Sequence, residues 1–263
     1  MTQYWPFSGL LRHGAPRERL IVSLDHVERA EALRIVDRLR PVVGMFKVGR
    51  ALFLGGGADF VREMRRRGAE VFLDLKFRDY PQNVVRAAIE ATRLGAKMFD
   101  IQPHGNLELM TRTRIEVSRV CRSEGLRRPH ILAVAMVACI RPGTSERHSM
   151  ETGDSVVRLA KLASEGALDG VFTPAQEARR VRDGCGRRFI IVASGVHTRE
   201  TGEPLALSTA DAIRAGADYV VVGGSIWQAA EPLRVVREIT EDVERGLRAN
   251  GRAAIELFPP RQA

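Results

Sequence analysis

Residues 67–75 read Arg67-Gly68-Ala69-Glu70-Val71-Phe72-Leu73-Asp74-Leu75, a glycine turn that leads directly into an apolar run. Glycine adopts the left-handed conformation that ends many helices, and the run 70–75 has the length and composition of a buried strand. The same turn recurs as Leu94-Gly95-Ala96 and as Ala215-Gly216-Ala217, each time before another apolar run. A helix that ends at glycine just before a strand is typical of repeated parallel βα units.

Eight strand-length runs alternate with segments of helical period along the chain. Strands are expected at 20–24, 45–48, 70–75, 98–101, 131–136, 170–172, 189–193 and 219–222. Helices, with apolar residues three or four apart, are expected at 27–39, 58–66, 83–94, 156–164 and 232–247. Eight such units most economically close into a single (β/α)8 TIM barrel of the α/β class, with an open doubly wound sheet as the alternative.

The expected barrel occupies residues 19–249 and leaves two short flanks. Residues 1–18 are interpreted as an N-terminal extension that caps the barrel floor. Residues 250–263, with Gly251 and Pro259-Pro260, are interpreted as a loosely held C-terminal tail.

The composition is that of a globular protein, since 44% of the 263 residues are hydrophobic and 28% are charged. The longest apolar run, 131–140, is far shorter than the roughly 18 residues that a membrane-spanning helix needs, so no membrane partner is expected. The start of the chain lacks the features of a signal peptide. Cys121, Cys139 and Cys185 are too widely spaced for a disulfide framework or a zinc site, which favours a cytoplasmic location.

The formal net charge of +9 raises the question of nucleic-acid binding. Basic residues alternate with acidic ones, and only three Tyr and two Trp could stack on bases, so we expect no nucleic-acid partner. Of the 41 basic residues 37 are arginine and four are lysine, and Lys47 and Lys76 lie near the ends of predicted strands. One interpretation of the arginine enrichment is the base composition of the genome. The other is that positions 47 and 76 need a compact, titratable ammonium group.

Ionisable residues gather where the first three predicted strands end, which is where a barrel enzyme places its reacting groups. The first strand ends at Asp25, the second carries Lys47, and the third carries Asp74 and Lys76 with Asp79 just beyond it. Side chains alternate across a strand, so Asp74 and Lys76 point to the same side, into the barrel mouth. We expect three carboxylates and two ammonium groups to share one pocket.

Such a network keeps both lysines protonated, because nearby opposite charges favour the charged form against the cost of burial. Lys76 is then a general acid and a poor Schiff-base nucleophile. The alternative is that Asp74, Lys76 and Asp79 form an ordinary ion-pair rim at a sheet edge. Charges inside an apolar strand are costly unless they are paired for use, which favours the catalytic interpretation.

The stretch Val71-Phe72-Leu73-Asp74-Leu75-Lys76-Phe77-Arg78-Asp79-Tyr80-Pro81-Gln82-Asn83 resembles the signature of the orotidine 5'-phosphate decarboxylase family, in which Asp-x-Lys-x-x-Asp is followed by Ile-Pro-Asn-Thr. Other segments also look like their counterparts in that family: Leu24-Asp25, Phe46-Lys47-Val48-Gly49, Leu168-Asp169-Gly170-Val171, Gln176-Glu177-Ala178 and Ala215 through Gly223. Together these segments cover roughly residues 20–235.

The resemblance implies a homodimeric decarboxylase with shared active sites, which acts on a phosphorylated small molecule and needs no metal and no cofactor. Lys76 would donate a proton to the carbon that loses carbon dioxide, and Asp74 would lie near the departing carboxylate. Asp79 would reach into the partner subunit's site, while Asp25 and Lys47 would bind the ribose. Related sugar-phosphate enzymes bind magnesium through a glutamate where this chain has Lys47, which would repel the cation.

The expected phosphate site departs from the family pattern. The family has Gly-Arg-Pro after the last strand, with the arginine on the phosphate, whereas this chain reads Gly223-Gly224-Ser225. Backbone N–H groups of Gly224 and Ser225 are the expected substitute. The other candidates, which could equally be solvated loop residues, are Arg141, His197 and Arg199.

The positions that would recognise the base also differ. Cys139 follows Ala138 where the family usually has Thr-Ser, and Asn83 stands where a threonine ends the signature. Ser194 begins the loop after the seventh strand, where a bridging glutamine is not evident. These residues are expected to contact the substrate. Because they differ from the family pattern, they identify the base of the substrate less clearly than the charged residues identify the reaction.

The sequence therefore predicts a carboxy-lyase that converts orotidine 5'-phosphate to uridine 5'-phosphate in pyrimidine biosynthesis, with Lys76 as proton donor. One alternative is a superfamily decarboxylase or aldolase that acts on another phosphorylated substrate, of the 3-keto-gulonate 6-phosphate or hexulose 6-phosphate type. The other is a barrel that binds a nucleotide without catalysis.

Overall fold

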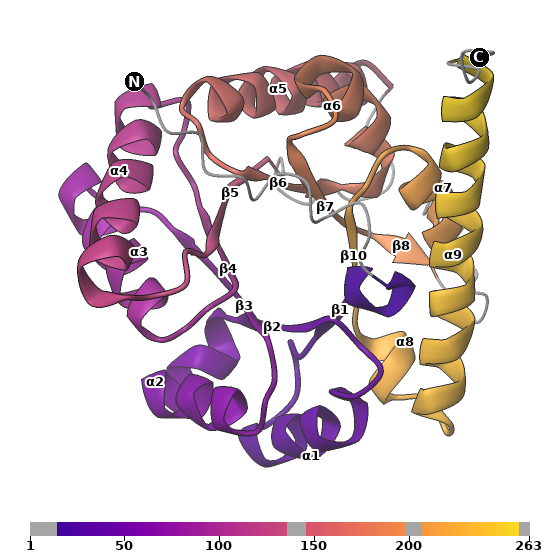
Figure 1. Ribbon diagram of the computed structural model, residues 1–263, viewed down its shortest axis with the longest axis horizontal. Helices are drawn as coiled ribbons and strands as arrows, with labels where there is room; N and C mark the ends of the chain where they lie inside the picture. Colours follow the sequence, from indigo (N-terminus) through magenta and orange to yellow (C-terminus); the bar gives the residue numbers. More distant parts are fainter. Residues whose placement is uncertain (1–14, 136–145, 198–206, 258–263) are drawn as a thin grey trace, which may run out of the picture.

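The computed structural model describes residues 15–135, 146–197 and 207–257, and these form a closed barrel of eight parallel strands (Figure 1). Around the barrel the strand order is β1-β10-β7-β6-β5-β4-β3-β2. The strands are β1 Leu20–Ser23, β2 Met45–Gly49, β3 Val71–Phe77, β4 Met98–Ile101, β5 His130–Val134, β6 Gly170–Pro174, β7 Ile190–Ser194 and β10 Tyr219–Val222. The prediction of a single (β/α)8 barrel is confirmed.

Helices surround the barrel, and at least one follows each barrel strand along the chain (Figure 1). They are α1 Arg29–Leu39, α2 Arg50–Arg66, α3 Pro81–Arg93, α4 Leu107–Glu124, α5 Glu146–Glu165, α6 Ala178–Cys185, α7 Thr209–Arg214, α8 Gly224–Trp227 and α9 Pro232–Leu257. Short elements complete the chain: η2 Pro16–Arg19, η3 Ala175–Glu177, β8 Val196–His197 and β9 Leu207–Ser208. Because α9 packs against α7 and runs to Leu257, it passes the boundary expected at residue 250, and the division into flanks stays a prediction.

Three of the predicted glycine turns end helices as expected. Gly68, Gly95 and Gly216 have φ angles of 82°, 78° and 110°, which are in the region that residues with a Cβ rarely enter. In each case the next strand begins within three residues, at Val71, Met98 and Tyr219. The turns therefore fix the amino-terminal end of the barrel.

The barrel interior is filled by one apolar layer and, above it, one polar layer. The apolar layer is a buried cluster to which all eight strands contribute: Ile21, Met45, Phe72, Met98, Leu132, Phe172, Ile190, Val192, Tyr219 and Val221. Alternation brings the residue two places further along each strand to the same side. On β2, β3 and β4 those residues are Lys47, Asp74 and Asp100, all buried. The polar layer therefore lies toward the carboxyl ends of the strands.

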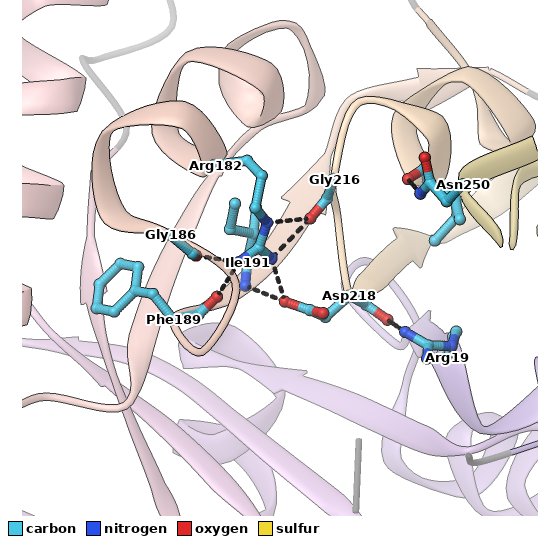
Figure 2. Close-up of polar contacts among 9 residues, drawn as sticks. Arg19, Arg182, Gly186, Phe189, Ile191, Gly216, Asp218 and Asn250 are labelled. Atoms are coloured by element: carbon cyan, nitrogen blue, oxygen red, sulfur yellow. Dashed lines mark hydrogen bonds and ion pairs between the residues drawn. The ribbon is translucent and has the colours of Figure 1, made fainter. Parts of the chain in front are cut away.

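A second polar cluster lies at the opposite, amino-terminal end of the barrel (Figure 2). The Arg182 guanidinium donates to the carbonyl oxygens of Gly186, Phe189 and Gly216 and to the Asp218 carboxylate. Asp218 Oδ2 also accepts the Ile191 N–H at 2.9 Å. This cluster, called here the floor cluster, ties α6 to the starts of β7 and β10.

Among the described residues no helix is both long enough and apolar enough to cross a bilayer.

Candidate active site

A chain of ion pairs connects β2 and β3 inside the mouth of the barrel. Lys47 Nζ donates to Asp74 Oδ2 at 2.8 Å and to Asp25 Oδ2 at 2.5 Å. Lys76 Nζ donates to Asp74 Oδ1, so the Asp74 carboxylate is shared by two ammonium groups. The structure therefore brings together four of the five charged residues that the sequence placed in one pocket.

Burial makes these pairs electrostatically strong. The side chains of Lys47 and Asp74 are each only 5% exposed. Burial by itself lowers the pKa of Lys47, but the carboxylates of Asp74 and Asp25 outweigh it and raise that pKa. Burial by itself raises the pKa of Asp74, but a hydrogen bond with Asp100 and the two ammonium groups lower it to about 2. Lys47 and Asp74 are therefore both charged over the whole neutral range.

Asp25 depends on a glycine of the neighbouring strand. A Cβ at Gly49 would lie 2.2 Å from Asp25 Oδ1, so only glycine leaves room for the carboxylate beside Lys47. Asp25 lies in the turn after β1, and its side chain is 37% exposed. It is the member of the network that solvent and substrate can reach most easily.

Lys76 is held in an unusual backbone conformation at a bulge in β3. Its φ angle is 50°, the left-handed region that few residues other than glycine adopt. The register between β3 and β4 shifts between Leu73 and Phe77, which pair with Phe99 and Ile101. A bulge re-aims the side chain at its position.

The Lys76 ammonium group also faces an aromatic ring. Its Nζ lies 5.7 Å from the ring centroid of Phe172, a residue of β6 in the apolar layer. A cation over an aromatic face is stabilised without forming a hydrogen bond. The ring also covers one side of the Lys76 side chain, which is 25% exposed. One face of the ammonium is therefore paired, and the rest of it is accessible from the barrel mouth.

Asp100, which the sequence analysis did not select, lies beside this network. It is fully buried in β4, and its Oδ1 accepts the Lys76 backbone N–H at 2.8 Å. Burial, the nearby Asp74 charge and a hydrogen bond with Asp74 raise the pKa of Asp100 well above its usual value. The signal was present in the sequence, because an aspartate inside the apolar run Met98–Ile101 is as anomalous as Asp74 in β3.

Asp79 and Asn83 lie outside the network in this chain. Asp79 is exposed, and its Oδ1 accepts the Tyr80 N–H at 2.6 Å and the Asn83 side-chain N–H at 3.0 Å. Both residues therefore lie at the start of α3, past the end of β3. The expectation that Asp79 brackets Lys76 is not met within one subunit, and its role in a partner's site stays a prediction.

The other predicted substrate contacts are only partly described. Ser194 ends β7 and is half-buried, and Gly223 precedes α8, whose first residues are Gly224 and Ser225. All four thus lie at the carboxyl ends of strands, on the side of the charge network. Cys139, Arg141 and Arg199 lie outside the described residues, and the roles proposed for this whole set stay predictions.

A hollow of about 150 Å³ opens between helix α5 and the carboxyl ends of β4 and β5. Its lining includes Gln102 and His104 after β4, Val134 and Ala135 at the end of β5, and Ser155 of α5. Gln102 lies two residues beyond Asp100, in the segment that follows β4. The hollow therefore offers a mixed polar and apolar surface at the same end of the barrel as the charge network, although no residue of that network lines it.

Within the part of the chain that the structure describes, no three metal-ligating side chains come together. The fold and the ion-pair network at the strand ends indicate the class of the protein: a (β/α)8-barrel enzyme whose pocket carries paired lysine and aspartate side chains.

Comparison with known proteins identifies the family. A family model described as orotidine 5'-phosphate decarboxylase / HUMPS matches residues 18–239, and the chain belongs to that family. An orotidine 5'-phosphate decarboxylase from Pelobacter propionicus is 38% identical over 237 residues, which cover 88% of this chain and 97% of the relative.

Solved structures agree on the barrel. An uncharacterised conserved protein from Geobacillus kaustophilus is 30% identical, with a TM-score of 0.69 over 85% of this chain and 99% of that one. An orotidine 5'-phosphate decarboxylase from Lactobacillus acidophilus superposes with a TM-score of 0.72 over 85% of this chain and 98% of that one. At 24% identity this second likeness supports the fold alone.

Proposed function

We propose that the chain decarboxylates orotidine 5'-phosphate to uridine 5'-phosphate, with Lys76 as the proton donor. The observation that carries the proposal is the buried Lys47–Asp74–Lys76 chain at the strand ends, in a protein that shares 38% identity with a relative of that name. The reaction belongs to pyrimidine biosynthesis.

In the proposed reaction the bond between the pyrimidine ring and its carboxylate breaks, and carbon dioxide leaves. The electron pair stays on the ring carbon, which then takes a proton from Lys76 Nζ. An ammonium group fixed in advance beside that carbon stabilises the developing negative charge, and it does so without reorganising at the moment of reaction. Solvent then reprotonates the neutral amine of Lys76.

Asp74 has two roles in this proposal. It holds the Lys76 ammonium in place, and its charge lies beside the carboxylate that leaves as neutral carbon dioxide. Lys47 and Lys76 keep Asp74 ionised, so its fixed negative charge repels the substrate carboxylate. This repulsion disappears when the carboxylate leaves as neutral carbon dioxide, which favours the transition state over the bound substrate. Asp25 and Lys47 are proposed to bind the ribose hydroxyls.

The substrate phosphate and the second subunit are parts of the same proposal. Gly223, Gly224 and Ser225 would meet the phosphate between β10 and α8, and binding energy gained there would be used at the transition state. The exposed position of Asp79 is compatible with a homodimer in which this carboxylate completes the partner's site. We further propose a cytoplasmic location and no requirement for metal or cofactor.

The experiment is the absorbance change of orotidine 5'-phosphate in chelator-treated buffer. A steady decrease with wild-type enzyme and none with Lys76→Ala is expected. No decrease at high enzyme concentration would contradict the assignment of this substrate. Decarboxylation or aldol cleavage of a sugar phosphate, dependent on added magnesium, would instead identify a sugar-phosphate enzyme of the same family, and nucleotide binding with no turnover would identify a binding protein.

A further inference from the structure

We propose that Asp100 is a positioning residue of this site, which holds the β3 bulge in the conformation that aims the Lys76 ammonium. The inference rests on the proposed function for its catalytic consequence. It adds a residue of β4 to a charge network otherwise built from β2, β3 and the turn after β1.

The geometry of the bulge carries the inference. Between the register pairs Leu73↔Phe99 and Phe77↔Ile101, β3 has three residues and β4 has only Asp100. The ladder therefore cannot supply a backbone partner for every N–H on β3, and the Lys76 N–H donates to Asp100 Oδ1 at 2.8 Å. Regular pairing resumes just beyond, where the Gln102 N–H donates to the Phe77 carbonyl at 2.9 Å.

The Lys76 backbone needs this support because its conformation is strained. A non-glycine residue at a φ of 50° costs of order 1 kcal/mol or more and persists only where surrounding contacts fix it. Without the Asp100 acceptor the buried N–H would be left unpaired, and β3 would relax toward regular pairing. The Lys76 side chain would then turn away from Asp74 and Phe172.

Burial and the Asp74 carboxylate favour the neutral form of Asp100, and they outweigh the Lys76 ammonium, which favours the ionised form. Asp74 and Lys76 face it from β3, and Lys47 of β2 lies beyond Asp74, while its register partner on β5, Leu132, is apolar. Its Oδ2 accepts no N–H or O–H from any other described residue. A proton on Asp100 turns this oxygen into a donor toward Asp74, which agrees with the raised pKa of Asp100 and the lowered pKa of Asp74.

Two substitutions of Asp100, by asparagine and by leucine, distinguish a positioning role from a role in core packing alone. Asp100→Asn keeps an acceptor for the Lys76 N–H and a donor for Asp74, whereas Asp100→Leu has a similar size and neither group. We expect Asp100→Leu to lower kcat at least about 100-fold with a far smaller change in KM. Asp100→Asn should keep kcat within about tenfold of wild type.

Two controls keep the result specific. Asp169 is the matched residue at the other end of the barrel, since its Oδ2 accepts the Ile131 N–H at 2.8 Å. Asp169→Leu should lower stability and leave kcat per folded molecule unchanged. Amide hydrogen exchange at Lys76, compared with Leu73 on the same strand, should speed up in Asp100→Leu and stay slow in Asp100→Asn, whatever the substrate is.

The inference fails if Asp100→Leu folds with wild-type kcat or wild-type exchange at Lys76, or if Asp100→Asn is as impaired as Asp100→Leu. Should Asp100→Leu not fold, Asp100→Ala, which also lacks the acceptor, replaces it in both measurements. Wild-type exchange at Lys76 in Asp100→Ala would overturn the inference. If wild type does not consume orotidine 5'-phosphate, the proposed function fails while the exchange measurement still tests Asp100.

Discussion

The two ends of the barrel each carry a buried charge cluster, and the clusters are built differently. In the floor cluster the single guanidinium of Arg182 donates to three backbone carbonyls and one carboxylate (Figure 2). At the mouth, among the described residues, the ammonium groups of Lys47 and Lys76 donate to carboxylates alone. In the floor cluster one side chain thus links several backbone segments, whereas the mouth network consists of contacts between side chains.

The difference separates stability from chemistry. A guanidinium cannot lose its proton in a protein and offers five donors in a rigid fork, which suits a permanent link between α6, β7 and β10. An ammonium group is compact and can give up a proton, which suits a general acid. Of the four lysines in a chain with 37 arginines, two lie in the mouth network, and one of them, Lys76, is the proposed proton donor.

The largest expected effect is on the mouth network. Lys76→Arg keeps the positive charge but removes the transferable proton, so kcat should fall by about 10⁴-fold or more while the protein stays folded. Turnover of orotidine 5'-phosphate and circular dichroism measure the two quantities. Lys161→Arg, at an exposed position of α5, is the matched control and should keep wild-type kcat. Substantial activity in Lys76→Arg would show that the network acts only through its charge.

The reverse effect is expected at the floor cluster. Arg182→Lys cannot reproduce the fork to Gly186, Phe189 and Gly216 and leaves partly buried carbonyls unpaired, so the free energy of unfolding should fall by about 1–3 kcal/mol. Urea unfolding measures the loss, and kcat per folded molecule should not change. Arg179→Lys is the control, because exposed Arg179 makes only one hydrogen bond to a backbone carbonyl, that of Arg214. A fall in kcat equal to that of a mouth variant would contradict the division between the two ends.

Most of the fold followed from the sequence because periodicity and glycine turns are local signals. All eight strands lie where they were expected, with ends that differ by a few residues. The helix expected at 58–66 instead begins at Arg50, because the chain continues as helix across a kink at Gly57, where φ is 64°. Gly55, Gly56 and Gly57 have low helix propensity and no apolar side chains, so hydrophobic periodicity does not reveal the helix there.

Only those parts of the site that depend on the alternation of side chains along a strand could be predicted from the sequence. Alternation predicted that Asp74 and Lys76 lie on the same side of β3, and they do form an ion pair, although the Lys76 backbone departs from regular strand geometry. The bulge at Lys76 and its support by Asp100 depend on the register between two strands, which no single stretch of sequence encodes. Asp79 lies outside the network because β3 ends at Phe77 and Asp79 already belongs to the turn that leads into α3.

A smaller effect is expected from crowding the mouth network without removing any of its members. In Gly49→Ala the new methyl group displaces the Asp25 carboxylate from Lys47, because the two atoms cannot share the space. Loss of one charge-assisted hydrogen bond, worth about 1.5–3 kcal/mol, should lower kcat/KM by about 10- to 100-fold. Steady-state kinetics measure it. Gly55→Ala is the control, since a Cβ there meets nothing within 4 Å. Equal kcat/KM values for Gly49→Ala and Gly55→Ala would show that the Asp25–Lys47 contact does not contribute to activity.

The smallest effect concerns how the two adjacent aspartates of the mouth respond to pH. The pKa of Asp74 is lowered to about 2 in the folded chain, so its stabilisation is complete above its unfolded pKa of about 3.9 and is lost only as pH falls toward 2. The raised pKa of Lys47 makes stability depend on pH only in the alkaline range, where the lysine loses its proton. Because the Asp74 charge raises the pKa of Asp100, the Asp74→Asn change is made in the Asp100→Asn background. The unfolding free energy of Asp100→Asn should then exceed that of the double variant by a constant amount, about 2 kcal/mol, between about pH 5 and about pH 8.

Asp100 should behave in the opposite way over the same range. Its raised pKa means that the folded chain keeps a proton that the unfolded chain releases, so wild type loses stability relative to Asp100→Asn as pH rises. Urea unfolding of the three proteins at several pH values gives both differences. A sloping difference for Asp74→Asn and a flat one for Asp100→Asn would place the proton on Asp74, and an uncharged Asp74 could neither hold the Lys76 ammonium nor repel the substrate carboxylate.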